Sequence, residues 1–198
     1  MCGRYYVDNE TAREIERIIR IADEKVRKTA PVNIHAKDIH PTDTAPILTA
    51  SGNNISCSLQ KWGLSGYDGK QVIFNARSET VLEKRMFREG VENRRIVIPA
   101  TWFYEWNRNK EKSIFYRKEQ PVLFMAGIYN RYQEEDRFVI LTTEANASME
   151  PVHNRMPLIL EPEEITDWIF AKEKAEQLLR KVPCLLERRT EFEQLSLF

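Results

Sequence analysis

The sequence has few cysteines and no long apolar stretch. Its three cysteines, Cys2, Cys57 and Cys184, lie far apart and form no CxxC pair, which argues against a disulfide framework and a structural zinc site. No apolar run is long enough to span a membrane, and the start lacks the charged-then-apolar pattern of a secretory signal. We therefore expect a soluble, cytoplasmic protein that needs no metal or other cofactor.

Net charge, internal repeats and low-complexity linkers are also absent. The 30 basic and 30 acidic residues give a formal net charge of zero, so the field of the whole protein will not drive strong non-specific binding to nucleic acid. Any such binding must come from a local arginine patch. The 198 residues suit one domain with a sizeable core.

The apolar pattern predicts the α+β class. Residues 8–28 read as an amphipathic helix with Ile15, Ile18 and Ile19 on one stripe, and Thr11 and Glu14 have capping-box spacing. Further helices are expected at 78–90, 161–170 and 172–182. Short β-like runs separated by turn residues predict a curled, mostly antiparallel sheet or a β-barrel-like core. These runs are 45–50, 55–62, 71–76, 94–100, 112–117, 121–129 and 137–143.

The N-terminus carries a possible nucleophile, because Cys2 directly follows Met1. Removal of Met1 would leave a free α-amine and a thiol on one residue, and both groups ordinarily titrate close to neutral pH. An aldehyde attacked by the amine would be trapped by the sulfur as a five-membered thiazolidine. Alternatively, Cys2 is only a small residue in a loose terminus.

Other polar residues do not fit strand packing. In "FNARSET", Asn75 and Arg77 stand where a strand meets a helix, a favourable place for a phosphate. Glu105 lies among aromatic residues in "PATWFYEWN", where desolvation suits a carboxyl to proton transfer. His153 stands two residues before Arg155 in "EPVHNRMP". Each residue also has a structural alternative: Asn75 could only cap the following helix, Glu105 could pair with an arginine, and His153 could be a half-buried structural histidine.

The remaining cysteines and histidines read as structural or solvated. Cys57 stands in an alternating strand and Cys184 follows a proline, so both are expected to be small buried residues. His35 and His40 lie in a loop-like stretch flanked by prolines and are expected to be solvated.

Read together, the motifs resemble one family closely: the abasic-site processing proteins, also called the SOS-response-associated peptidase (SRAP) family. The resemblance rests on "MCGR", "WGL", "NARSET", "RRIVIPA", "FYEW", "AGIY", "LTTEAN" and "HNRMP", in that order along the chain. It implies a single SRAP domain, taken here as residues 1–190. It also implies a channel for single-stranded DNA and covalent capture of abasic sites.

The resemblance also implies roles for single residues. Cys2 is the nucleophile that joins the ring-opened sugar after autocatalytic removal of Met1, and Asn75 holds the N-terminal amine or the sugar. Glu105 moves protons, and His153 assists at the sugar and in reversal of the link. The DNA contacts it implies are Arg4, Arg77 and Arg155 for phosphates and Trp62 or Trp106 for a base. A hydrolase-type autopeptidase and an abasic-site lyase activity follow from this chemistry.

Two departures from the family pattern and two other functions stay open. Asn154 follows His153 where the family commonly has an acidic residue, and Trp102 stands where it has a glycine. The first alternative function is a thiol peptidase with Cys2 and His153 as its dyad and Asn75 or Asn154 as orienter. The second is a non-covalent binding module for single-stranded DNA.

The C-terminal tail, residues 191–198, ends in a pentapeptide that looks like the peptide by which bacterial repair proteins bind the DNA sliding clamp. Its contacts would come from Gln194, Leu195, Leu197 and Phe198. The alternative is that the apolar residues pack on the domain as a last strand. Because the clamp works at replication forks, a clamp-binding tail would bring the protein to the forks and so to the nucleoid.

Overall fold

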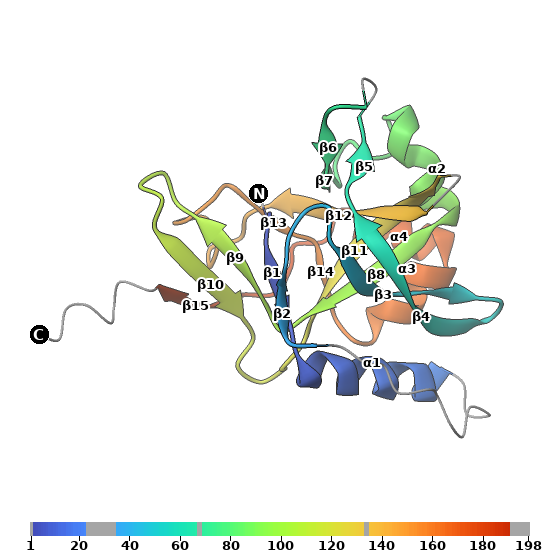
Figure 1. Ribbon diagram of the computed structural model, residues 1–198, viewed down its shortest axis with the longest axis horizontal. Coiled ribbons are helices and arrows are strands. Elements are labelled where there is room, and N and C mark those ends of the chain that lie inside the picture. Colours follow the sequence, from blue (N-terminus) through green and yellow to red (C-terminus); the bar gives the residue numbers. More distant parts are fainter. Residues whose placement is uncertain (1, 23–34, 67–68, 133–134, 191–198) are drawn as a thin grey trace, which may run out of the picture.

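An eight-stranded sheet (the larger sheet), a five-stranded sheet (the smaller sheet), a short two-stranded sheet and four helices make up the part of the chain that the structure, a computed structural model, describes: residues 2–22, 35–66, 69–132 and 135–190 (Figure 1). The helices are α1 (Asn9–Ala22), α2 (Arg85–Asn93), α3 (Glu164–Phe170) and α4 (Lys172–Leu178). The strands are β1 (Tyr5–Val7), β2 (Lys37–Ile39), β3 (Thr44–Ser51), β4 (Asn54–Trp62), β5 (Leu64–Ser65), β6 (Val72–Ile73), β7 (Asn75–Arg77), β8 (Arg95–Ala100), β9 (Trp102–Trp106), β10 (Lys112–Tyr116), β11 (Leu123–Arg131), β12 (Asp136–Glu144), β13 (Arg155–Pro157), β14 (Ile159–Leu160) and β15 (Glu187–Thr190).

The larger sheet curls back on itself. Its strand order is β13-β12-β4-β3-β8-β11-β14, β7 also pairs with β12, and an additional β11–β12 pairing joins the two halves of the path. The pairings are antiparallel except that β12 runs parallel to β4 and β7. The expected α+β class and curled, mostly antiparallel sheet are confirmed, and all seven predicted β runs contain strand residues.

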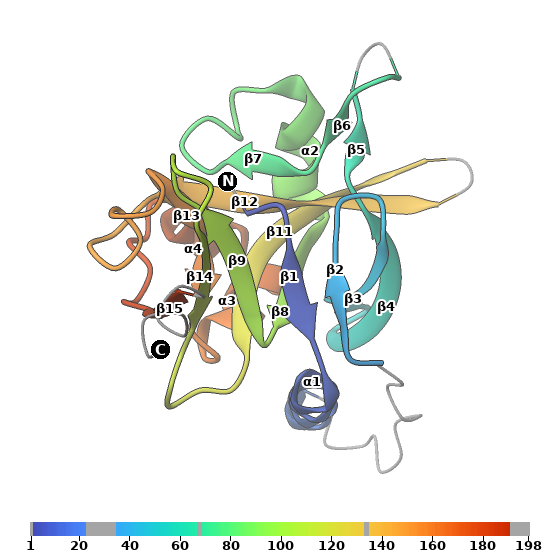
Figure 2. The same cartoon turned by 60° about the vertical axis from the view of Figure 1, so that its left-hand side comes forward.

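The smaller sheet positions the N-terminus. Its order is β15-β10-β9-β1-β2, so β1 lies between β9 and β2, with Tyr5 opposite both Phe103 and Ile39 (Figure 2). The N-terminus lies beside β7 and β13 in both views. Strands β1 and β2 were not predicted, because three residues give too little alternation, and the residues of β9 were singled out only as a functional stretch.

The capping box of helix α1 lies three positions earlier than expected. The Asp8 carboxylate accepts hydrogen bonds from the N–H groups of Glu10 (2.9 Å) and Thr11 (3.1 Å), and the Asp8 N–H donates to the Thr11 hydroxyl (3.2 Å). The box is therefore Asp8 with Thr11. Glu14 instead forms an ion pair with Arg17 at 2.6 Å. Residues 23–28 of the predicted helix lie outside the described residues.

The other helices are shorter than expected. Residues 78–84 form turns and a bend in which Val81 is fully buried, and α2 starts at Arg85. Helices α3 and α4 cover 164–170 and 172–178 of their predicted ranges. His35 and His40 are exposed as expected, whereas Cys57 and Cys184 are half-buried. None of the described helices is long and apolar enough to cross a membrane.

Candidate active site at the N-terminus

The Cys2 side chain is fully buried just before β1. The Asn75 side-chain amide, on β7, donates to the Cys2 carbonyl at 2.8 Å, and the Cys2 Sγ lies 3.8 Å from the Arg4 carbonyl oxygen. Burial, followed by the negative charge of Glu105, raises the pKa of the Cys2 thiol well above its usual value. The thiol is therefore protonated at neutral pH, and a nearby base must accept its proton.

Glu105 supplies a carboxylate whose negative charge acts on the pKa of that thiol. It lies in β9 with 4% of its surface exposed. Its Oε1 accepts a hydrogen bond from the main-chain N–H of Trp106, with 3.4 Å between nitrogen and oxygen. Alternation along β9 turns Phe103 and Glu105 inward, and Ser113 of β10 stands opposite Glu105. The register of β1 on β9 is what brings this carboxylate to the chain start.

His153 lies in the turn before β13. Its main-chain N–H donates to the Met149 carbonyl at 3.0 Å, and its Nδ1 accepts the Arg155 N–H at 2.9 Å. An Nδ1 that accepts a hydrogen bond carries no proton, so the neutral imidazole has its proton on Nε2. That tautomer can donate a hydrogen bond through its Nε2–H.

A groove of about 760 Å³ brings His153 and Trp106 together. It lies between the loop after β9 and the turn before β13. Sequence analysis missed Arg108, which is exposed on the same groove, although it stands only two residues beyond the quoted "FYEW" motif. The residues along the groove are Trp106, Asn107, Arg108, Asn109, Glu150, Pro151, Val152, His153 and Asn154.

Comparison with known proteins identifies the family. The pattern of the SOS response associated peptidase (SRAP) family matches residues 1–196. The chain belongs to the SRAP family. It is 30% identical over 188 residues to the abasic site processing protein YoqW of Bacillus subtilis (strain 168), covering 87% of this chain and 81% of YoqW. It is 27% identical over 177 residues to the abasic site processing protein YedK of Escherichia coli (strain K12), covering 85% and 79%.

Solved structures support the same fold. A crystal structure of a protein from Bacteroides thetaiotaomicron matches with a TM-score of 0.76 and 25% identity, covering 96% of this chain and 91% of that one. A Bordetella bronchiseptica protein matches with a TM-score of 0.75 over 96% of this chain and 99% of that one. The family names connect this SRAP chain with the processing of abasic sites in DNA and with the DNA-damage response.

Two arginines of the expected DNA-contact set face the outside of this SRAP domain. Arg77 is exposed at the end of β7, two residues from Asn75 on the same side of the strand. Arg4 is half-buried, forms an ion pair with Asp38 and lies 4.7 Å from the centre of the Tyr104 ring. Partial burial would raise the pKa of Asp38, but the hydrogen bonds from Arg4 and Tyr104 outweigh it and lower that pKa.

Arg155 has both terminal nitrogens of its guanidinium, Nη1 and Nη2, committed to protein acceptors. Its guanidinium makes a two-point contact with the Glu79 carboxylate (2.7 and 2.8 Å) and donates to the Thr142 carbonyl at 2.6 Å. Only 8% of its surface is exposed. The structure therefore uses Arg155 to fix β13 and the turn that carries His153, and not to present a charge to a phosphate.

Trp62 is also committed to the interior. It is fully buried, its indole N–H donates to the Phe74 carbonyl at 2.8 Å, and its ring packs 5.2 Å from Tyr5 and 6.3 Å from Phe138, centre to centre. No face of this ring is open to a base. Trp106, half-buried on the groove, is the tryptophan of the expected pair that can meet one.

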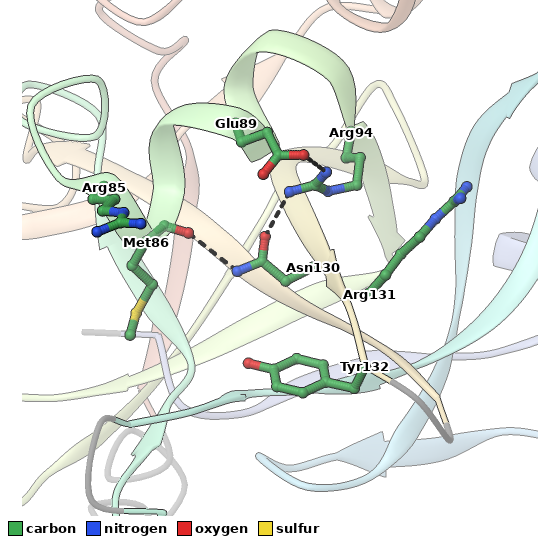
Figure 3. A pocket seen from close by; sticks show the side chains of 7 residues that line it. All are labelled: Arg85, Met86, Glu89, Arg94, Asn130, Arg131 and Tyr132. Atoms are coloured by element: carbon green, nitrogen blue, oxygen red, sulfur yellow. Dashed lines mark hydrogen bonds and ion pairs between the residues drawn. The ribbon is translucent and has the colours of Figure 1, made fainter.

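A second cavity, of about 720 Å³, holds none of the predicted site residues. It lies between α2 and the end of β11 (Figure 3). Asn130 is fixed there by donating to the Met86 carbonyl and accepting from Arg94, both at 3.1 Å. The cavity has charged walls but no cysteine or histidine. Elsewhere in the described residues, no cluster of three or more His, Cys, Asp or Glu residues could hold a metal ion.

Proposed function

We propose that this protein captures abasic sites in single-stranded DNA through a thiazolidine formed by Cys2. The observation that carries the proposal is the meeting of three groups at the chain start: the buried Cys2 thiol, the Asn75 amide on the Cys2 carbonyl, and the inward carboxylate of Glu105. The membership of the SRAP family and the named relatives support the substrate.

The proposed sequence begins with hydrolysis of the Met1–Cys2 peptide bond, in which one water is consumed and the Cys2 amine is released. This is the autopeptidase step. The neutral amine then adds to the aldehyde carbon of the ring-opened sugar, and the resulting carbinolamine loses water to give an imine. Asn75 is suited to hold the reacting residue through its main chain, and Glu105 to accept the amine proton and return it to the leaving hydroxyl.

Ring closure completes the link. The Cys2 sulfur forms a bond to the imine carbon, the carbon–nitrogen double bond becomes single, and the thiol proton ends on the nitrogen by way of Glu105. The whole crosslink releases one water. His153 would donate a hydrogen bond from its Nε2–H to the ring oxygen of the sugar, and so assist the transfer of the sugar hydroxyl proton to that oxygen when the ring opens. An imine that is not closed gives β-elimination and strand cleavage, which is the lyase activity.

DNA contacts are proposed on the open side of the site. Arg77 and Arg4 are suited to bind phosphates, and Trp106 to stack a neighbouring base in the groove beside His153. The proposal differs from a papain-type peptidase, in which the nucleophilic thiol has a lowered pKa, whereas burial raises the pKa of the Cys2 thiol here.

A denaturing gel with abasic single-stranded DNA tests the proposal. Protein whose mass shows Met1 removed should form an adduct that survives boiling in detergent, with the summed masses of protein and DNA less one water. Cys2→Ala keeps the amine and should give only a hydrolysable imine, trapped by borohydride. A complex that dissociates on boiling would favour the non-covalent binding module and overturn the crosslink.

We also propose that residues 194–198 bind the DNA sliding clamp. Gln194, Leu195, Leu197 and Phe198 lie outside the described residues, so this proposal is based on the sequence motif and on the DNA substrate. Binding to the clamp would raise the local concentration of the protein at replication forks in the nucleoid without changing its active site.

A further inference from the structure

The outer face of the five-stranded sheet carries a row of aromatic residues. Along β9, Phe103 and Glu105 are buried on the inner face, and Trp102, Tyr104 and Trp106 alternate with them on the other face. Trp102 and Trp106 are half-buried, whereas Tyr104, between them, is buried under Arg4 and Lys112. Trp106 belongs to the groove beside His153. Trp102 stands four residues earlier, about 13 Å away along the strand.

Trp102 is held rigidly on one side and open to a slot on the other. Its ring stacks on Tyr6 of β1, with the centres 4.1 Å apart and the planes 6° from parallel. Beyond it, toward β10, lies a slot of about 240 Å³. Besides Trp102, the slot is lined by Thr101, Ile114, Tyr116, Arg117, Pro121 and Arg189.

The walls of this Trp102 slot favour a flat aromatic group. Its volume is below the ~300–1,000 Å³ of sites for drug-sized ligands, so a single planar ring system suits it better. The Thr101 hydroxyl is already engaged with Asp8 at 2.9 Å and with Thr11 at 2.9 Å. Apolar and aromatic surface therefore dominates, which suits stacking without recognition of one particular base.

A positive charge stands at the mouth of the slot. Arg117 is occupied by Glu161 at 2.6 Å, but Arg189 of β15 is exposed, and no ion pair within the described residues includes it. Arg189 lies opposite Ile114 in the register of β15 on β10. An aromatic wall with an arginine beside it is the combination that holds a base and its phosphate.

The surface between the slot and the groove is also cationic. Arg4 lies 4.7 Å and the Lys112 Nζ 5.2 Å from the centre of the Tyr104 ring, midway along β9. Asp38 partly neutralises Arg4 here, so the basic side chains between the two ends of the face are Lys112 and the Asp38-paired Arg4. Basic side chains along the path suit a negatively charged strand.

We propose that the Trp102 slot binds one base of the single strand outside the abasic site, with Arg189 on an adjoining phosphate. This inference rests on the proposed function, since it takes the groove at Trp106 and His153 as the place of the abasic nucleotide. It adds a second contact that lengthens the bound segment and determines on which side of the lesion the protein needs unpaired DNA.

Equilibrium binding of intact oligonucleotides, measured by fluorescence anisotropy, tests the slot without any covalent step. One oligonucleotide is short enough to reach only Trp106, and two others extend it on the 5′ or the 3′ side. Trp102→Ala should weaken binding of one extended strand about tenfold. The short strand should bind as before. Phe170→Ala, which removes an exposed aromatic on α3, is the matched control.

The salt dependence of the same binding tests whether Arg189 contacts a phosphate. Arg189→Gln should reduce the slope of log K against log salt by about 0.7 on the extended strand, the value for one phosphate contact on a single strand. Arg180→Gln, an exposed arginine after α4, should leave the slope unchanged. Thermal unfolding checks that each variant is folded, and Trp102→Tyr, which keeps a ring, should restore most of the affinity.

Unchanged binding of both extended strands by folded Trp102→Ala would overturn the proposal. It would also be overturned if deletion of residues 194–198 strengthened strand binding only while Trp102 was present, since the slot would then hold the tail. Crosslinking of a short abasic strand by Trp102→Ala should equal that of the unmodified protein. If the unmodified protein forms no crosslink but Trp102→Ala still weakens strand binding, the proposed crosslinking function is wrong and the proposal that the slot binds a base still holds.

Discussion

At the scale of single residues, the buried pair of Cys2 and Glu105 sets the order of the chemistry. A free α-amine ordinarily titrates near 7.7–8.0, whereas burial and the charge of Glu105 raise the pKa of the Cys2 thiol well above its usual value. At neutral pH a usable fraction of amine is therefore neutral while the thiol keeps its proton. The amine attacks first, and the sulfur follows once Glu105 can accept its proton.

Glu105→Gln tests this coupling. The variant keeps the shape and hydrogen-bonding capacity of the side chain but removes its titrating charge, so crosslinking should slow by about 10²–10⁴-fold. The pKa of the Cys2 thiol should fall, because the negative charge of Glu105 raises it. Gel kinetics and thiolate absorbance across pH measure the two effects. A slower reaction with an unchanged thiol pKa would mean that Glu105 does not act on the sulfur.

Arg155 and Glu79 give a prediction about stability. Partial burial would raise the pKa of Glu79, but hydrogen bonds from Arg155 and its charge outweigh burial and lower it. A carboxyl with a lowered pKa in the folded state adds stability above its unfolded pKa, and this is lost as the pH falls through the folded value. Arg155→Gln should therefore lower the free energy of unfolding at pH 7 by about 1–2 kcal/mol.

The deficit should start to shrink as the pH falls below the unfolded pKa of Glu79, about 4.3, and should disappear below its lowered folded pKa, where Glu79 is protonated in both states. Urea titrations at several pH values measure it, with Arg180→Gln as the exposed control. A deficit that stays constant across the range would show that the contact of Arg155 with the Thr142 carbonyl carries the stability, and not the ion pair.

At the scale of elements, the curled sheet depends on a close approach at Gly127 of β11. A Cβ at this position would lie 2.3 Å from the Ile98 Cδ1 and 2.8 Å from the Val139 carbonyl oxygen. The Ile98 methyl belongs to a flexible side chain, but the carbonyl is part of the neighbouring strand β12. Any side chain here must therefore push β11 and β12 apart.

Gly127→Ala should destabilise the protein by about 1–3 kcal/mol, the usual cost of overpacking a core. Chemical denaturation measures the change. Gly90→Ala in α2 is a suitable comparison, since its Cβ would meet only the Ile128 side chain, at 3.0 Å, and alanine favours a helix over glycine. Equal stability of the Gly127→Ala variant and the unmodified protein would show that the β11–β12 pairing can widen freely.

The elements that sequence patterns predict are those with enough residues to show a period. Strands such as β3, β11 and β12, with eight or nine residues, were predicted, whereas the three-residue β1 and β2 were not. The candidate site residues carried motif signals, but their burial depended on strand register. Trp62 and Arg155 looked like DNA contacts because nothing local shows that β4 and β13 turn these side chains inward.

At the scale of the whole molecule, the smaller sheet relates the chain start to the chain end. Strand β15, from which residues 191–198 continue, is separated from β1 by β10 and β9, which corresponds to about 14 Å across the sheet. The proposed crosslinking residue precedes β1, and the proposed clamp-binding tail follows β15 along the chain. Because different strands carry the two segments, the two functions should separate on truncation.

Deletion of residues 194–198 should abolish binding to the cognate sliding clamp and leave crosslinking of naked abasic DNA unchanged. Leu197 and Phe198 would be the apolar anchors in a clamp pocket and Gln194 the polar contact, as expected for a short peptide whose few buried side chains provide most of the affinity. Surface plasmon resonance on immobilised clamp and gel kinetics measure the two activities, with Glu193→Gln, just before the pentapeptide, as a control that should keep both. Loss of thermal stability on deletion would instead show that the tail packs on the domain, and unchanged clamp binding would exclude the pentapeptide as the docking segment.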